Sequence, residues 1–257
     1  MGYTRGGRPG IFSHRAAPIQ INFLGYPGTS GADFFDYIVA DKTLIPVKNQ
    51  RFFSEKVIYL PNSYQPQDNE KVSSDEKLTR TAVGLPEDAF IFCCFHNSYK
   101  IMPGEFKIWL RLLKNINNSV LWLLKTNDFV AENLQLLAKK NGINPARLVF
   151  FLRTDYPKYL SSLSIADLFL DTFNYNAGAT ASDALRAGLP VITKQGLGYS
   201  ARMASSLLQA LKLPELIAYS IEEYENIAYQ LATNPERLHK MISRSNKRMP
   251  QDNRYIV

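Results

Sequence analysis

Small, uncharged residues run directly into an amphipathic segment in NAGATASDALRAGLP, residues 176–190. Gly178 and Ala179 add almost no bulk before the expected helix, whose first-turn amides and dipole attract anions. The stretch therefore predicts a phosphate-binding turn. The alternative needs no ligand: Thr180 and Asp183 are spaced as a capping box, in which each side chain bonds the backbone of the other.

Lys100 is the cation expected to face that turn, because it follows the apolar run FIFCCFH, residues 90–96, at the same edge of the predicted sheet. Tyr159, with Tyr156 nearby, offers an aromatic ring that could stack on a base, and core packing explains it equally well. The loop LGYPGTSGAD, residues 24–33, would let backbone approach a polar ligand. It lacks the phosphate-loop pattern, and the dinucleotide-binding glycine pattern is also missing.

Predicted strands and helices alternate regularly from about residue 85 onward, and they must position these residues. Apolar runs predict buried strands at 90–96, 119–125, 147–151, 166–172 and 189–196. Patterns of helical period predict helices at 103–116, 129–142, 156–165, 180–188, about 200–211 and 221–247, the last interrupted near Pro235. Such alternation predicts an α/β, doubly wound domain, in which ligands bind beyond the carboxyl ends of the parallel strands.

The first 85 residues are organised differently. They suggest a strand at 19–24, a Gly/Pro-rich loop, a short helix and a second strand at 57–61, followed by a polar linker at 65–77. Two strands and a helix are too few to form an independent core. This segment is therefore expected to dock on the second domain or to be a remnant of something larger.

Composition restricts the classes of partner. The formal charge of +7 over 257 residues suits an anionic ligand, but no zinc-finger spacing, RNA-binding aromatic signature or arginine stripe favours nucleic acid. The three histidines are scattered, which disfavours a metal site, and the adjacent Cys93 and Cys94 are expected to be buried thiols. No apolar run is long enough for a membrane span and no secretory signal is visible, so a cytoplasmic location is expected.

Several segments in fixed order closely resemble the catalytic region of protein O-GlcNAc transferases, the GT-B family that includes the SPINDLY-type plant enzymes. These segments are LGYPGTSGADFFDY, SEKVIYLP, FHNSYKI, SVLWLLK, ADLFLDT, TASDALRAGLPVIT, ARMASSLL and LPELI. The resemblance implies a GT-B fold seen as a partial chain. Residues 1–85 would be the remnant of the N-terminal catalytic half, 86–248 the C-terminal Rossmann-like domain that binds the UDP-sugar, and 249–257 a tail.

The resemblance also implies an activity: inverting transfer of N-acetylglucosamine from UDP-GlcNAc to Ser or Thr hydroxyls of an acceptor protein, without a metal or other cofactor. Lys100 falls where a lysine contacts the donor phosphates, and Thr180 at the phosphate-binding start of a helix. The other implied donor-site positions are Asn97 in the same pocket, Tyr159 near the uracil, Asp183 at the ribose hydroxyls, and Gly178, Ala179, Gly25, Tyr26, Pro27 and Gly28.

The sequence departs from the family pattern before the helix. Many members carry a histidine and a threonine where this chain has Gly178 and Ala179, so an imidazole and a hydroxyl near the diphosphate are missing. Backbone amides are then expected to bind more of the anion. The histidines that the family places upstream have no equivalent here, and His14 does not replace them. A partner chain could supply that half; the alternative function is a catalytically inactive UDP-sugar-binding or interaction module.

Overall fold

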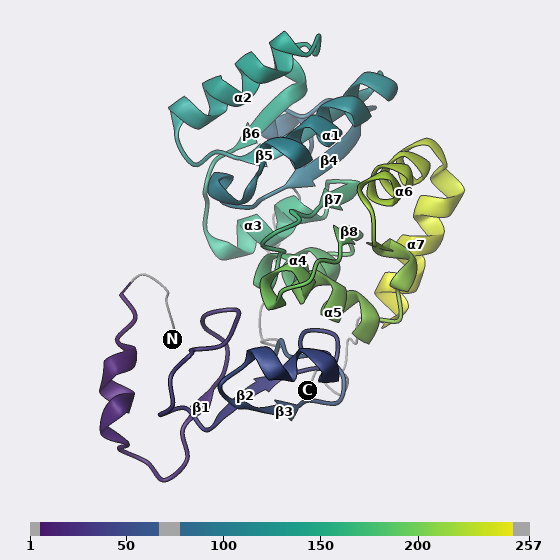
Figure 1. The fold of residues 1–257 in the computed structure, drawn as a ribbon. Helices are drawn as coiled ribbons and strands as arrows, with labels where there is room; N and C mark the ends of the chain where they lie inside the picture. The colour runs from purple at the N-terminus through teal and green to yellow at the C-terminus, as the bar shows by residue number, and fades with distance from the viewer. Residues whose placement is uncertain (1–5, 67–77, 249–257) are drawn as a thin grey trace.

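Two parallel β-sheets organise the computed structural model, which describes residues 6–66 and 78–248 (Figure 1). The larger sheet has the strand order β6-β5-β4-β7-β8-β9. The chain thus starts in the middle, builds outward to β6, and returns to build the other half. The order reverses between β4 and β7, which creates a topological switch point there. The strands are β4 (Phe90–Cys94), β5 (Ser119–Leu124), β6 (Leu148–Phe151), β7 (Leu168–Leu170), β8 (Val191–Lys194) and β9 (Ile217–Ala218).

Helices cover this sheet, and one hydrophobic core runs through it, as the α/β, doubly wound prediction requires. They are α1 (Pro103–Asn115), α2 (Asp128–Lys140), α3 (Tyr156–Leu163), α4 (Ala179–Arg186), α5 (Met203–Ala210), α6 (Ile221–Thr233) and α7 (Pro235–Arg248). Cys93 and Cys94 are buried free thiols, as expected. Over the described ranges, none of the helices is both long and apolar enough to cross a membrane.

The N-terminal sheet contains three strands, β1 (Ile21–Asn22), β2 (Tyr37–Ala40) and β3 (Lys56–Tyr59), in that order and all parallel. The prediction of a short helix after the Gly/Pro-rich loop is wrong, because that segment forms the strand β2. Its side chains alternate between half-buried and buried positions, which is the two-residue period of a strand. Most of the linker expected at 65–77, and the tail at 249–257, lie outside the described residues.

The buried carboxylate of Asp41 connects the N-terminal sheet to the larger one. It accepts hydrogen bonds from the Leu44 amide at 2.9 Å, the Tyr64 amide at 3.0 Å and the Ser206 hydroxyl of α5 at 2.5 Å. The Arg202 guanidinium adds a bond to the Thr43 carbonyl at 2.5 Å. The small N-terminal core therefore docks against the start of α5, as the sequence suggested for a segment too small to be stable alone.

The buried carboxylate of Glu55 shapes the loop before β2. One oxygen accepts from the Ser30 amide at 2.7 Å and from Asn22 at 3.2 Å; the other accepts from the Thr29 hydroxyl at 2.6 Å and from Ser54 at 3.1 Å. Burial alone would raise the pKa of Glu55, but the bonds from Ser30 and Thr29 outweigh it and the pKa lies below its usual value. An ionised Glu55 thus holds the Gly/Pro-rich loop to β1 and β3.

Asp41→Asn is expected to lower the free energy of unfolding by about 2 kcal/mol, because an amide cannot accept from all the donors around Asp41 without turning its own NH₂ toward one of them. Urea unfolding followed by circular dichroism measures the loss. Asp33→Asn, on an exposed loop, is the matched control. Equal midpoints for Asp41→Asn and the unaltered chain would contradict the proposed docking role.

Glu55→Gln is expected to loosen the loop at 24–31 while leaving the larger sheet intact. Since the folded pKa of Glu55 is lowered, its contribution to stability is complete above the usual value of 4.5 and is lost as the pH falls through the folded pKa. Amide hydrogen exchange at pH 7 should therefore speed up at 24–31 in Glu55→Gln, and not in the control Glu132→Gln on exposed α2. Unchanged exchange in that loop would show that Glu55 does not hold it.

Candidate functional site

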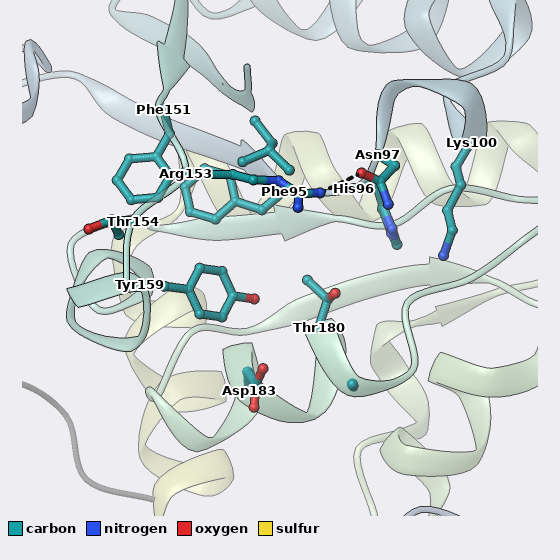
Figure 2. Close-up of a pocket in the computed structure, with 12 residues that line it drawn as sticks. Phe95, His96, Asn97, Lys100, Phe151, Arg153, Thr154, Tyr159, Thr180 and Asp183 are labelled. Carbon is teal, nitrogen blue, oxygen red and sulfur yellow. Dashed lines mark hydrogen bonds between the residues drawn. The ribbon is translucent and has the colours of Figure 1, made fainter. Parts of the chain in front are cut away.

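A cavity of about 310 Å³ opens at the carboxyl ends of β4, β5 and β6, beside the switch point between β4 and β7 (Figure 2). This is where the strand order places a ligand site. Segments far apart in the sequence contribute to it: the loops after β4 and β6, and helices α3 and α4. Its lining residues are Phe95, His96, Asn97, Lys100, Leu124, Phe151, Arg153, Thr154, Tyr159, Ala179, Thr180 and Asp183.

Asn97 and Lys100 reach the cavity from the turn that follows β4, and Figure 2 shows the Lys100 side chain pointing toward α4. The Asn97 side-chain oxygen accepts a hydrogen bond from the Arg153 guanidinium at 3.0 Å. Lys100 is partly buried, and this burial lowers its pKa, although the Asp171 carboxylate acts in the opposite direction. The site therefore holds an ammonium group that has lost much of its water.

The start of α4 forms the opposite wall. The helix begins at Ala179 with Gly178 as N-cap, and no side chain caps it. The capping box expected for Thr180 and Asp183 is thus wrong: Thr180 already lies inside the first turn, and one Asp183 oxygen accepts from the Tyr156 hydroxyl at 2.6 Å instead. The first turn keeps its amides for another acceptor.

Aromatic rings form one end of the cavity. Phe95 and Phe151 stack with centroids 4.9 Å apart, and the ring of Tyr159 lies 6.2 Å from that of Phe95. In Figure 2 these rings lie away from Lys100, with Thr180 and Asp183 along the side between the two ends. The cavity is therefore apolar and aromatic at one end and cationic at the other.

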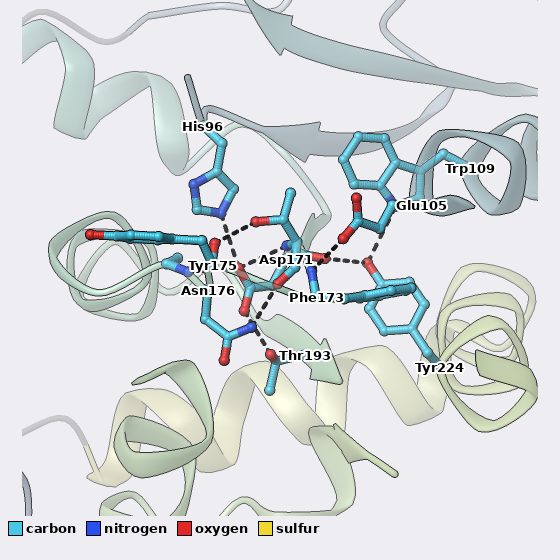
Figure 3. Close-up of polar contacts among 11 residues, drawn as sticks. His96, Glu105, Trp109, Asp171, Phe173, Tyr175, Asn176, Thr193 and Tyr224 are labelled. Atoms are coloured by element: carbon cyan, nitrogen blue, oxygen red, sulfur yellow. Dashed lines mark hydrogen bonds and ion pairs between the residues drawn. The ribbon is translucent and has the colours of Figure 1, made fainter. Parts of the chain in front are cut away.

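The buried carboxylate of Asp171, just beyond β7, ties the surrounding loops together (Figure 3). One oxygen lies 2.9 Å from Nε2 of His96 and accepts from the Ala177 amide at 2.7 Å. The other accepts from the Thr193 hydroxyl at 2.6 Å. A single side chain thus connects the end of β4, the turn before α4 and the end of β8.

Glu105 of α1 fixes the same turn from the other side. Its carboxylate accepts from the Phe173 amide at 2.6 Å and from the Met102 amide at 2.5 Å, at the start of α1. Burial raises the pKa of Glu105 despite these two bonds. Behind it, the Tyr224 hydroxyl donates to the Asp171 carbonyl at 3.1 Å. The turn that leads into α4 is therefore held by carboxylates from two elements.

Gly178 does not line the cavity, and it is tightly packed. A Cβ atom there would lie 2.5 Å from the Met203 methyl and 2.9 Å from the Tyr64 hydroxyl. Gly178 therefore permits the N-terminal unit to pack closely against the start of α4. This packing, and not a ligand contact, is the role that the structure gives to its missing side chain.

Gly25, Tyr26, Pro27 and Gly28 lie on the N-terminal unit, outside the lining of the cavity. Burial raises the pKa of the Tyr175 phenol, and the phenols of Tyr99 and Tyr26 raise it further.

Two sets of residues at the site were missed from the sequence. Arg153 and Thr154 follow β6, at the strand end where ligands were expected, but nothing in their types singled them out. The pair of His96 and Asp171 joins residues 75 positions apart. Only the adjacency of β4 and β7 in the sheet could have revealed it. Among the residues that the structure describes, no three His, Cys, Asp or Glu side chains gather as a metal site.

Comparison with known proteins identifies the family. The model of glycosyl transferase family 41 matches residues 1–74 and 66–254. A probable UDP-N-acetylglucosamine–peptide N-acetylglucosaminyltransferase, SEC, of Arabidopsis thaliana is 36% identical over 246 residues, which are 93% of this chain and 25% of that protein. A Caenorhabditis elegans enzyme described as a UDP-N-acetylglucosamine–peptide N-acetylglucosaminyltransferase is 26% identical, over 93% of this chain and 30% of its own length.

Solved structures agree on the fold. A mutant of the Thermobaculum terrenum O-GlcNAc transferase superposes with a TM-score of 0.83 at 25% identity, covering 93% of this chain and 45% of that one. The sucrose-phosphate synthase of Thermosynechococcus elongatus superposes with a TM-score of 0.62 at 16% identity, covering 83% of this chain and 53% of that one. The chain spans about a quarter of the length of the curated relatives it matches. It belongs to glycosyl transferase family 41 and has a GT-B-like α/β fold.

Proposed function

We propose that this chain is the donor-binding part of a protein O-GlcNAc transferase, which moves N-acetylglucosamine from UDP-GlcNAc to Ser or Thr hydroxyls of an acceptor protein with inversion and without a metal. The observation that carries the proposal is the pairing of Lys100 with the uncapped start of α4 across one cavity. Its relatives' description as UDP-N-acetylglucosamine–peptide transferases supports the choice of donor.

The uridine belongs at the aromatic end of the cavity. The half-buried ring of Tyr159 can stack on the uracil, as aromatic rings do on bases. The Asp183 carboxylate accepts from Tyr156 and lines the cavity, where it can also accept from a ribose hydroxyl. In this arrangement the nucleoside extends along α4 toward its first turn.

The diphosphate then lies between Lys100 and the first turn of α4. The amides of Ala179 and Thr180 can donate to its oxygens, and the helix dipole favours its negative charge. The lysine supplies a full positive charge in a partly dehydrated site, where electrostatic attraction is stronger than in water. Together they balance the charge of the leaving UDP, which is the task a metal ion performs in other transferases.

The cavity residues account for the donor side of the reaction and not for its acceptor side. The attacking hydroxyl needs a base within hydrogen-bond reach, and none of the cavity residues has been placed opposite the expected sugar position. The strand β1 forms an edge of the N-terminal sheet, and Ile21 within it and Ile19 and Phe23 beside it are exposed. We therefore assign the acceptor side to further polypeptide that pairs along β1.

Titration of UDP into the chain by isothermal calorimetry tests the donor site. UDP is expected to bind, with equal affinity in magnesium and in EDTA, because Lys100 and helix amides balance its charge. Lys100→Ala should weaken UDP about tenfold or more, since it removes a charged donor from a partly buried site. The control is Lys107→Ala, which removes the same charge from an exposed position on α1.

Each arm of this titration has a result that counts against the proposal. No binding at millimolar UDP would rule out both a transferase and an inactive UDP-sugar-binding module. If Lys100→Ala and Lys107→Ala weakened UDP binding equally, the loss at Lys100 would reflect only the change in net charge and not a contact with the phosphates. A further assay measures hydrolysis of UDP-GlcNAc by the UDP that it releases. Hydrolysis indicates an enzyme, and its absence indicates a binding module.

A further inference from the structure

The ammonium group of Lys100 rests on an aromatic ring. Its Nζ atom lies 3.8 Å from the centroid of the Tyr175 ring, which is the geometry of a cation–π contact. No carboxylate of the described residues forms an ion pair with Lys100. The contact joins two loops, the turn after β4 and the turn before α4, across the cationic end of the cavity.

The backbone on both sides of Tyr175 is fixed, so the ring offers a defined support. The Tyr175 carbonyl accepts from the Thr172 hydroxyl at 2.7 Å, and the next amide, that of Asn176, donates to the Ser200 carbonyl at 2.8 Å. On the other side, the Ser200 hydroxyl donates to the Asn174 carbonyl at 2.9 Å. Lysine by itself has a long, flexible side chain that loses rotamer freedom when it is held.

We propose that Tyr175 is a positioning residue for the donor diphosphate: its ring holds the Lys100 ammonium over the turn before α4, ready to donate to phosphate oxygens. An ammonium has three N–H donors, and contact with one ring face leaves donors directed away from that face. Because the ring holds the lysine before the ligand arrives, less conformational freedom is lost on binding. The ring contributes no hydrogen bond to the ligand itself.

The location of the ring fits this role. Tyr175 is half-buried, three residues before Gly178 and four before the first residue of α4. Tyr26 on the N-terminal unit and Tyr99 beside Lys100 lie close enough to affect its phenol. Figure 3 shows the Tyr175 ring beside His96, which precedes the Lys100 turn. The ring therefore lies between the turn after β4 and the turn before α4.

This inference rests on the proposed donor site, and a double-mutant cycle measured with UDP separates the two. Tyr175→Leu is expected to weaken UDP about three- to tenfold, the range of a partly dehydrated cation–π contact. Tyr175→Phe keeps the ring and should restore most of the affinity. In the Lys100→Ala background, Tyr175→Leu should have no further effect, because the two residues act through one contact.

Uridine without phosphate separates positioning of the diphosphate from a merely structural role. Tyr175→Leu should leave the affinity for uridine unchanged, whereas general damage to the cavity would weaken it. Tyr229→Leu, at a partly exposed position on α6, is the matched control, and thermal unfolding confirms that each variant is folded. Equal or tighter UDP binding by Tyr175→Leu, additive losses in the double variant, or a parallel loss of uridine affinity would overturn the role of Tyr175. Failure of the unaltered chain to bind UDP would instead overturn the donor site.

Discussion

The buried carboxylate of Asp171 is the constraint on which the candidate site depends. It stands at the point where the strand order of the larger sheet reverses, and it makes hydrogen bonds with groups from three different segments. A negative charge without access to water is stable only when donors surround it. The irregular loops around the site are therefore held in one arrangement by their hydrogen bonds to the Asp171 carboxylate.

Carboxylates play the same part elsewhere in the molecule. Asp41 collects donors from the N-terminal unit and from α5, Glu55 collects them from the loop before β2, and Glu105 from the turn before α4. In each case a buried acceptor takes backbone amides that have no partner in a helix or sheet. The segments around the cavity are mostly irregular, so these acceptors supply the rigidity that regular structure supplies elsewhere.

The fold of the larger sheet could be predicted from sequence because each of its main strands is a continuous apolar run that is buried on both faces. Shorter elements are not predictable in this way: β9 has only two residues, and β2, where the pattern indicates a helix, pairs as a strand between β1 and β3. The cavity could be located from the rule for strand ends, which brought Asn97, Lys100, Tyr159, Ala179, Thr180 and Asp183 to one place. The roles of these residues toward a ligand stay predictions.

What sequence could not supply was the set of contacts between distant residues. The capping box does not form because the N-cap of α4 is Gly178, two residues before Thr180. The pair of His96 and Asp171 and the contact of Lys100 with Tyr175 depend on which strands are neighbours. Local pattern carries no information about such partners, since they are fixed only by the order of the sheet.

The close packing at Gly178 has a consequence for how this lineage can vary. Position 178 has no room for a side chain while Tyr64 and Met203 keep their places, and these residues come from separate parts of the chain. Any larger residue at 178 therefore requires the side chains at 64 and 203 to be smaller or displaced. The three positions should covary among homologues, because space at one of them is shared with the other two.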